Sequence, residues 1–171
     1  KNDYKMMSVL IEQIVKRPDL KAAFMAGDRD KLISIIQPEY DIYKTKYGIT
    51  QYNYYLPGDT ATLFLAMSNT AKYGQKIGLD RRTLYDAVKT QKMTQGLELG
   101  TQGYAIRVTV PYFDGEKLIG YFGLGEEINK FCAVLKELTG NDFGLVLQKK
   151  YLKKTDWETT MSSLKKRNNW E

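Results

Sequence analysis

A glutamate and an arginine interrupt two otherwise apolar segments of this chain. Glu98 lies in Gly-Leu-Glu-Leu-Gly over residues 96–100, and Arg107 lies in Tyr-Ala-Ile-Arg-Val-Thr-Val over residues 104–110. If a tight turn joins these segments as antiparallel strands, Glu98 and Arg107 lie diagonally opposite each other on one sheet face. A buried charge is costly unless it is paired or used. Because a guanidinium group can bind a carboxylate through two parallel hydrogen bonds, Arg107 predicts either an ion pair with Glu98 or a site for a carboxylate ligand. The two can coexist.

Three tyrosines and a second arginine complete the candidate ligand-binding residues. Side chains alternate along a strand, so Tyr121 is expected on the same sheet face as Arg107. We expect Tyr52 and Tyr54, from an earlier strand, to line the same cavity, because a tyrosine offers both an apolar ring and a hydroxyl. Core packing is the alternative for each tyrosine. Arg81 lies at the start of a predicted helix and is expected either at the cavity mouth or in solvent.

The composition excludes several kinds of chemistry. The chain has no histidine and a single cysteine. Histidine triads, histidine-ligated metals and intramolecular disulfides are therefore ruled out. We expect no catalytic residues, no metal site and no cofactor. An acid–base enzyme that uses Glu98 with a tyrosine or lysine is a further hypothesis, but no nucleophile–base pair can be placed from the sequence.

Positive charge gathers near the end of the chain. The formal net charge is +6, and residues 149–171 contain seven Lys or Arg against three Asp or Glu. A solvated helical tail, a tail close to anionic lipid headgroups and a nucleic-acid-binding segment are the three interpretations. A basic nucleic-acid-binding domain is accordingly the alternative function, although the predicted sheet lacks a stripe of basic and aromatic residues.

The first 48 residues are predicted to be helical. Apolar residues recur every three or four positions from Tyr4 to Ile14 and form one stripe, which predicts a helix. This stripe could pack on its own domain or form a homodimer interface. Pro18 ends that helix, and a second helix should stop at Gly27. Asp28 is a suitable N-cap for a third helix, which we expect Pro38 to kink.

The rest of the chain alternates between strands and helices. Strands are expected over 49–55, 61–67, 96–100, 103–111, 117–125 and 143–148, and helices over 80–92, 126–139 and from 157 onward. The strands over 96–125 form a meander, because glycine-bounded runs follow one another at short spacing. The order predicts an α+β fold with a five-stranded antiparallel sheet behind a long N-terminal helix. We expect a helical region over 1–48, a core over 49–148 that contains the sheet, and a basic tail over 149–171 that is helical.

Several short motifs occur in the order found in a known family. They are Ala-Gly-Asp-Arg-Asp-Lys-Leu at 26–32, Tyr-Gly-Ile-Thr at 47–50, Lys-Tyr-Gly at 72–74, Gly-Leu-Glu-Leu-Gly at 96–100, Arg-Val at 107–108, Asp-Gly at 114–115, Gly-Tyr-Phe-Gly-Leu-Gly-Glu-Glu-Ile at 120–128, and Tyr-Leu at 151–152 with Trp-Glu at 157–158. Together they resemble the PAS-like double-Cache sensor regions of prokaryotic histidine kinases, diguanylate cyclases and chemotaxis receptors. The likeness covers nearly the whole chain.

This resemblance implies a sensor with no catalytic activity of its own. It implies an extracytoplasmic location, a membrane-anchored parent protein and a small-molecule ligand. Arg107 suggests that this ligand is a carboxylate, and the apolar stripe suggests a homodimer through the N-terminal helix. It implies no nucleic acid. The chain begins with Lys1 rather than Met, and we expect it to be part of a longer protein.

Two positions depart from the family pattern. Relatives carry Phe-Leu-Arg followed shortly by His where this chain has Phe-Leu-Ala-Met-Ser at 64–68, and they carry Glu where this chain has Gly123. Charged or polar groups near the expected cavity are therefore missing. The ligand of a relative should not be transferred to this chain.

Overall fold

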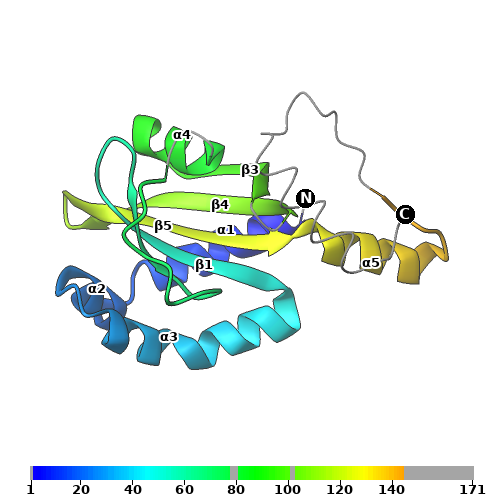
Figure 1. Ribbon diagram of the computed structural model, residues 1–171, viewed down its shortest axis with the longest axis horizontal. Coiled ribbons are helices and arrows are strands. Elements are labelled where there is room, and N and C mark those ends of the chain that lie inside the picture. Colours follow the sequence, from blue (N-terminus) through cyan, green and yellow to red (C-terminus); the bar gives the residue numbers. More distant parts are fainter. Residues whose placement is uncertain (1, 78–80, 101–102, 145–171) are drawn as a thin grey trace.

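The computed structural model describes residues 2–77, 81–100 and 103–144 of the chain (Figure 1). The expected basic tail over 149–171 lies outside these residues, as does most of the strand expected over 143–148. In the described part, five α-helices surround one five-stranded antiparallel sheet. The predicted α+β, PAS-like fold is confirmed.

The sheet has the strand order β2-β1-β5-β4-β3. The strands are β1 (Ile49–Leu56), β2 (Thr62–Ala66), β3 (Thr94–Gly100), β4 (Gly103–Asp114) and β5 (Lys117–Glu127). The expected meander is formed by β3, β4 and β5, while β1 pairs with β5 and so places the two ends of the sheet sequence side by side.

Three helices precede the sheet. They are α1 (Asn2–Ile14), α2 (Pro18–Met25) and α3 (Arg29–Ile42), and α3 continues into a π-helical turn, η1 (Tyr43–Tyr47). Pro18 occupies the first turn of α2, where its missing N–H costs nothing. The side chain of Asp28 caps α3 by accepting a hydrogen bond of 3.0 Å from the backbone of Lys31. Pro38 lies inside α3 without ending it.

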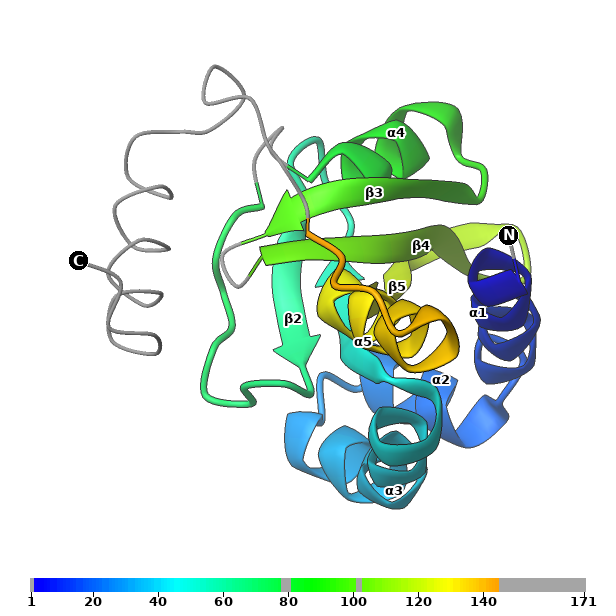
Figure 2. The same cartoon turned by 90° about the vertical axis from the view of Figure 1, so that its right-hand side faces the viewer.

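These three helices cover one face of the sheet (Figures 1 and 2). The stripe on α1 is buried against this face: Met7 and Ile11 have no exposed surface, and Ile14 is almost as buried. The residues expected to serve either the core or a dimer thus pack within their own domain. Val9, on the other side of α1, is 58% exposed.

An aromatic core lies between the helices and the sheet. Tyr52 and Tyr54 are fully buried in it, and each ring lies 4.8 Å from the ring of Phe122. Phe24 of α2 adds a contact of 5.2 Å to Tyr54. We refer to four tyrosines of this layer as the buried tyrosine cluster: Tyr40, Tyr52, Tyr54 and Tyr112.

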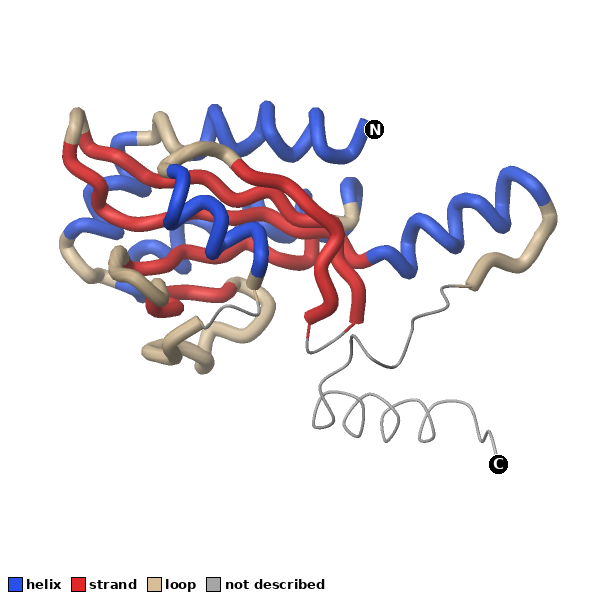
Figure 3. Tube along the Cα trace, turned by 90° about the horizontal axis from the view of Figure 1, so that it is seen from above, coloured by secondary structure: helices blue, strands red, loops and turns tan. Residues whose placement is uncertain are grey.

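The opposite face of the sheet is only partly covered. Helix α4 (Arg82–Thr90) lies across β3, β4 and β5 and forms a smaller apolar cluster through Leu84 and Ala87 (Figure 3). The loop that follows β2 crosses the remaining part of this face. Helix α5 (Ile128–Thr139) continues from β5 and extends beyond the end of the sheet (Figures 1 and 3).

Candidate functional site

Strand register brings Glu98 and Arg107 together. In the β3–β4 pair, Arg107 is opposite Gly96 and Glu98 is opposite Ala105, which makes the two charges diagonal neighbours as predicted. Arg107 Nε lies 3.2 Å from Glu98 Oε2, and both side chains are almost fully buried, with 6% and 4% of their surface exposed. The ion pair of the sequence-based prediction is therefore present, on the face of the sheet that α4 partly covers.

Glu98 also connects the ion pair to α4. Its Oε1 accepts a hydrogen bond from the backbone N–H of Thr83, in the first turn of that helix. A carboxylate is favourable at this position, because the first backbone N–H groups of a helix have no partner within it. The hydroxyl of Thr83 additionally meets the Thr109 hydroxyl at 3.3 Å. The start of α4 is thus fixed to the same charged pair that lies on the sheet.

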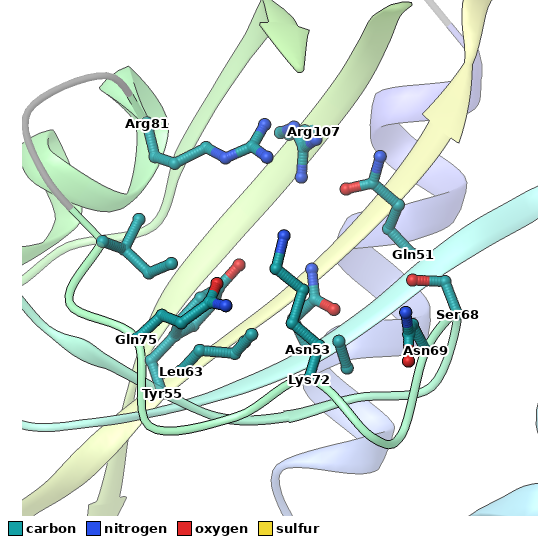
Figure 4. Close-up of a pocket in the computed structure, with 12 residues that line it drawn as sticks. Gln51, Asn53, Tyr55, Leu63, Ser68, Asn69, Lys72, Gln75, Arg81 and Arg107 are labelled. Atoms are coloured by element: carbon teal, nitrogen blue, oxygen red, sulfur yellow. The ribbon is translucent and has the colours of Figure 1, made fainter. Parts of the chain in front are cut away.

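A cavity of about 140 Å³ opens beside Arg107. Its floor comes from β1 and β4, and its rim comes from β2, the loop after β2 and Arg81 (Figure 4). The lining residues are Gln51, Asn53, Tyr55, Leu63, Ala66, Ser68, Asn69, Lys72, Gln75, Ile77, Arg81 and Arg107. Ligand clefts commonly measure about 300–1,000 Å³. The cavity is smaller than this range, so a ligand that fills it would be a small molecule.

Three cationic side chains converge on this cavity. Figure 4 shows Arg81 and Arg107 reaching toward each other, with the amine of Lys72 directed to the same space from the loop. Among the described residues, neither Arg81 nor Lys72 has an ion-pair partner. The described lining residues include no Asp or Glu. The cavity therefore carries more positive charge than the protein neutralises.

A smaller hollow of about 10 Å³ lies beneath this cavity, and unpaired polar atoms surround it. Asn53 Oδ1, Arg81 Nη1, Glu98 Oε2 and Arg107 Nε are buried without a hydrogen-bond partner, and all four residues line the hollow. Leaving such an atom unsatisfied costs about 1–3 kcal/mol. The space is close to what one water molecule requires. Glu98 Oε2 and Arg107 Nε still face each other across the ion pair, so Asn53 Oδ1 and Arg81 Nη1 are the atoms available to a water or to the polar end of a ligand.

Two glycines of β5 make room for the arginine. Gly123 and Gly125 face the same side as Arg107, and a Cβ atom at Gly125 would lie 3.4 Å from Arg107 Cγ and 3.3 Å from Gln51 Cβ. A Cβ atom at Gly123 would approach the Thr109 hydroxyl to 3.2 Å. The lack of a side chain at Gly123 therefore leaves space above the sheet beside Thr109.

The surroundings of Arg107 lower the pKa of its guanidinium group. Burial is the main cause that lowers the pKa of Arg107, to about 10, and the charge of Arg81 acts in the same direction. Tyr55, Glu98 and Glu127 oppose the shift. Arg107 is still protonated at neutral pH. An anion in the cavity would stabilise that charged form.

The cavity loop is held from its outer side by Arg29. This residue, at the start of α3, donates hydrogen bonds to the carbonyl of Phe64 at 3.0 Å and to the carbonyl of Thr70 at 2.5 Å. Its guanidinium carbon also lies 3.8 Å from the ring centre of Tyr73. The loop that carries Lys72 is thus attached to the helical layer.

The six residues predicted for ligand binding fall into three groups. Arg107 and Arg81 line both cavities, and Glu98 lines the deeper one. Tyr121 lies on the expected face, but α4 covers it and its hydroxyl accepts a hydrogen bond of 2.8 Å from Gln91. Tyr52 and Tyr54 were expected on the cavity side, and the structure corrects this placement, since both belong to the buried tyrosine cluster on the opposite face.

The reason for that correction is the long-range pairing of β1 with β5. Tyr52 is opposite Leu124 and Tyr54 is opposite Phe122, and directly opposite residues share a face. The cavity-facing residues of β1 are their neighbours Gln51, Asn53 and Tyr55. The prediction placed Tyr52 and Tyr54 toward the cavity because they are aromatic. Their pairing with Leu124 and Phe122 of β5 shows that they face the helices instead.

Lys72 was also missed as a lining residue. It lies in the motif Lys-Tyr-Gly, which the sequence marks only as a loop. A basic residue in an exposed loop has no pattern that directs it toward a cavity.

The architecture and the site define a class of protein. A five-stranded antiparallel sheet with helices on one face and a polar cavity on the other is a PAS-like domain of the kind that binds small molecules. Residues 1–169 match the sequence profile of the family described as the double sensory domain of two-component sensor kinases, so the chain belongs to that family and is a sensory domain.

Solved structures support the same fold. A domain of a putative sensory box/GGDEF family protein from Vibrio parahaemolyticus superposes with a TM-score of 0.59 at 11% identity, covering 82% of this chain and 59% of that one. The ligand-binding domain of the Campylobacter jejuni chemoreceptor Tlp3, in complex with 4-methylisoleucine, gives 0.51 at 17%, covering 82% and 54%. The ligand-binding domain of the Pseudomonas aeruginosa PAO1 amino-acid chemoreceptor PctC, with GABA, gives 0.51 at 13%, covering 80% and 56%.

This chain spans between half and three fifths of the length of those structures. A search of curated proteins found no match. Nothing in these comparisons supports the nucleic-acid-binding alternative. Among the described helices, none has the length and apolar character needed to cross a membrane.

Proposed function

We propose that this chain is the extracytoplasmic ligand-binding part of a membrane-anchored signalling receptor, and that a small anionic molecule binds beside Arg107. The observation that carries the proposal is the cavity itself. It combines converging cations with buried polar atoms that have no partner, and these are the features of a site built for a polar ligand. The output module of the parent protein is taken to be a kinase, a cyclase or a chemotaxis signalling domain.

Arg107 and Arg81 are proposed to hold the anionic group of the ligand. A guanidinium can donate two parallel hydrogen bonds to a carboxylate, and Arg81 Nη1 has no protein partner within the described residues. Asn53 and Gln51 add amide groups to the floor of the cavity. The neighbours solved with GABA or 4-methylisoleucine support a small-molecule ligand in general terms, but this chain's ligand follows from its own side chains.

Signal transfer is proposed to use the elements attached to the cavity. Ligand bound at Arg107 would act on α4 through Glu98 and Thr83, and on α3 through the loop held by Arg29. A ligand shifts a conformational equilibrium only by its difference in affinity for the two states. The helical region over 1–48 and the tail over 149–171 would carry that shift toward the membrane. A homodimer would have to use surfaces of α1 other than its buried stripe.

A thermal-shift screen of the purified chain tests this proposal. Small carboxylates, amino acids, amines, sugars and purines are each added in excess, and the melting temperature is recorded for the natural sequence, for Arg81→Met and for Arg82→Met. Arg82 is the matched control, because its exposed side chain pairs with Asp86 and does not line the cavity. A ligand at about 100 times its dissociation constant adds about 2.7 kcal/mol of stability.

We expect an anionic compound to raise the melting temperature, and we expect Arg81→Met but not Arg82→Met to remove that rise. If no compound in the screen stabilises the natural sequence, or if both substitutions act alike, the proposed site is wrong.

A further inference from the structure

The ligand class can be narrowed from the charges that surround the cavity, on the assumption that the proposed function is correct. Three cations approach it: Arg81, Arg107 and Lys72. One carboxylate, Glu98, lies 3.2 Å from Arg107, and it lines only the deeper hollow. Glu127 also acts on Arg107 electrostatically, but it lines neither cavity. Arg81 and Lys72 are left without a counter-charge among the described residues.

Among the described residues, the same lining offers no group suited to an ammonium ion. An ammonium ion in a partly buried site needs acceptors and a compensating negative charge. The described lining residues of the larger cavity supply amide, hydroxyl and apolar groups but no carboxylate. Both oxygens of Glu98 are directed to other groups, one to the Thr83 N–H and the other to Arg107. An amino acid would bring its ammonium group next to three cations.

The positions of the cations also matter. Arg81 and Arg107 meet at one end of the cavity, while Lys72 approaches from the loop, as Figure 4 shows. A ligand with one anionic group can form ion pairs at only one of these two positions at a time. A ligand with two anionic groups can serve both.

We infer that the ligand is a small dianion without an ammonium group, with one anionic group at Arg81 and Arg107 and the other at Lys72. A short dicarboxylate satisfies both positions and is of a size suited to a cavity of about 140 Å³. Inorganic phosphate shares the dianionic chemistry but is compact. The neighbours solved with GABA and 4-methylisoleucine bind compounds of a different charge type.

Four-carbon probes separate these possibilities, because they differ by one group at a time. Succinate has two carboxylates, butyrate lacks one of them, aspartate adds an ammonium to succinate, and GABA adds an ammonium to butyrate. Affinities are measured by calorimetry on the full chain, with inorganic phosphate as a further probe. We expect succinate to bind at least about tenfold more tightly than butyrate, aspartate or GABA. Phosphate binding with a similar affinity would identify a compact dianion as the source of the preference.

Matched variants locate the second anionic group. Lys72→Met should reduce the preference for succinate over butyrate to less than about threefold, while Lys76→Met should leave it unchanged. Lys76 lies in the same exposed loop but does not line the cavity. Because Lys72 is exposed, its substitution should not impair folding, and the melting temperature of each variant checks this.

The outcomes test separately the proposed function, the charge type of the ligand and the position of its second anionic group. If aspartate or GABA binds more tightly than succinate and Arg81→Met weakens that binding, the chain is a sensor at this site but the inferred charge type is wrong. If Lys72→Met and Lys76→Met have equal effects, the second anionic position is wrong. If none of the probes and no compound of the broader screen binds, the proposed function fails as well.

Discussion

Replacing Glu98 by Gln should change stability and anion affinity in opposite directions. The substitution keeps the shape of the side chain and keeps an oxygen that can accept the Thr83 N–H, but it removes the negative charge 3.2 Å from Arg107 Nε. Arg107 would then be a buried cation without its partner. Breaking a buried pair in this way costs about 3–5 kcal/mol. In a domain of this size each kcal/mol corresponds to about 2–4 °C, so the melting temperature should fall by roughly 6–20 °C.

Anion affinity should increase in the same variant. A charge about 8 Å from a ligand contributes about 2 kcal/mol at an effective dielectric constant of 20. Removing the negative charge of Glu98 therefore favours an anion beside Arg107 by about 1–2 kcal/mol, which is roughly a 5–30-fold gain in affinity. Saturating anion should also recover part of the lost melting temperature, because a ligand that binds only the folded state stabilises it.

The assay combines thermal unfolding with calorimetric titration of succinate. The double variant Glu98→Gln with Arg107→Met removes both charges and should lose less stability than the sum of the two single changes, by about 0.5–3 kcal/mol. The reasoning is refuted if Glu98→Gln leaves the melting temperature unchanged. It is also refuted if affinity for succinate falls together with stability, since removing a negative charge near the site should favour a dianion.

Three further predictions concern the fold that supports the site. Gly120→Ala should destabilise the domain by about 1–3 kcal/mol, measured by chemical denaturation, because the new Cβ atom would overlap the backbone oxygen of Tyr55. Ile11→Ala should cost about 2–5 kcal/mol in the same assay, because Ile11 is fully buried in the core. Stability should fall as the pH rises above 10, because burial raises the pKa of the buried tyrosine cluster above the ordinary 10.0, and that of Tyr40 to about 12. The unfolded chain then loses phenolic protons before the folded one does, which favours unfolding.

Controls accompany each of these predictions. Gly144→Ala should have no effect, because a Cβ atom there meets nothing within 4 Å, and Val9→Ala should change stability by less than about 0.5 kcal/mol because Val9 is exposed. Equal losses for the paired variants would contradict the packing described above. For the alkaline transition, a step of tyrosinate absorbance beyond that of exposed tyrosines such as Tyr47 and Tyr73 should accompany unfolding; the same additional step well before unfolding would show that the cluster is accessible to solvent.

Local patterns were sufficient to predict most of the fold. The glycine-bounded runs over 96–125 predicted the meander, and alternation along β4 correctly placed Arg107 and Thr109 on the face opposite Val108. The Asp28 cap and the stop near Gly27 were also predicted correctly, because both depend on backbone groups a few residues away.

The cavity could be predicted only in part, because its lining comes from segments distant in sequence. Arg107 and Glu98 were found because a charge inside an apolar strand is conspicuous and its partner is on the adjacent strand. The choice of Tyr52 and Tyr54 failed because the facing of β1 is set by its pairing with β5, about 70 residues later in the chain. Lys72 depends on the path of a loop, which no periodic pattern encodes.

The attachment of Arg29 has a mechanical consequence for the sensory domain. The loop that presents Lys72 to the cavity is bound on its other side by Arg29, the first residue of α3. Arg29 also binds the carbonyl of Phe64 at the adjoining strand β2. A displacement of the loop would therefore be transmitted to α3. Movement of Lys72 toward a bound ligand would thus act on α3 through Thr70 and Tyr73, which contact Arg29 in the same loop. In this arrangement the same loop contributes to ligand recognition and connects the cavity to α3. Mutations that retune ligand choice in it would also change how strongly the domain responds, so the two traits should evolve together rather than independently.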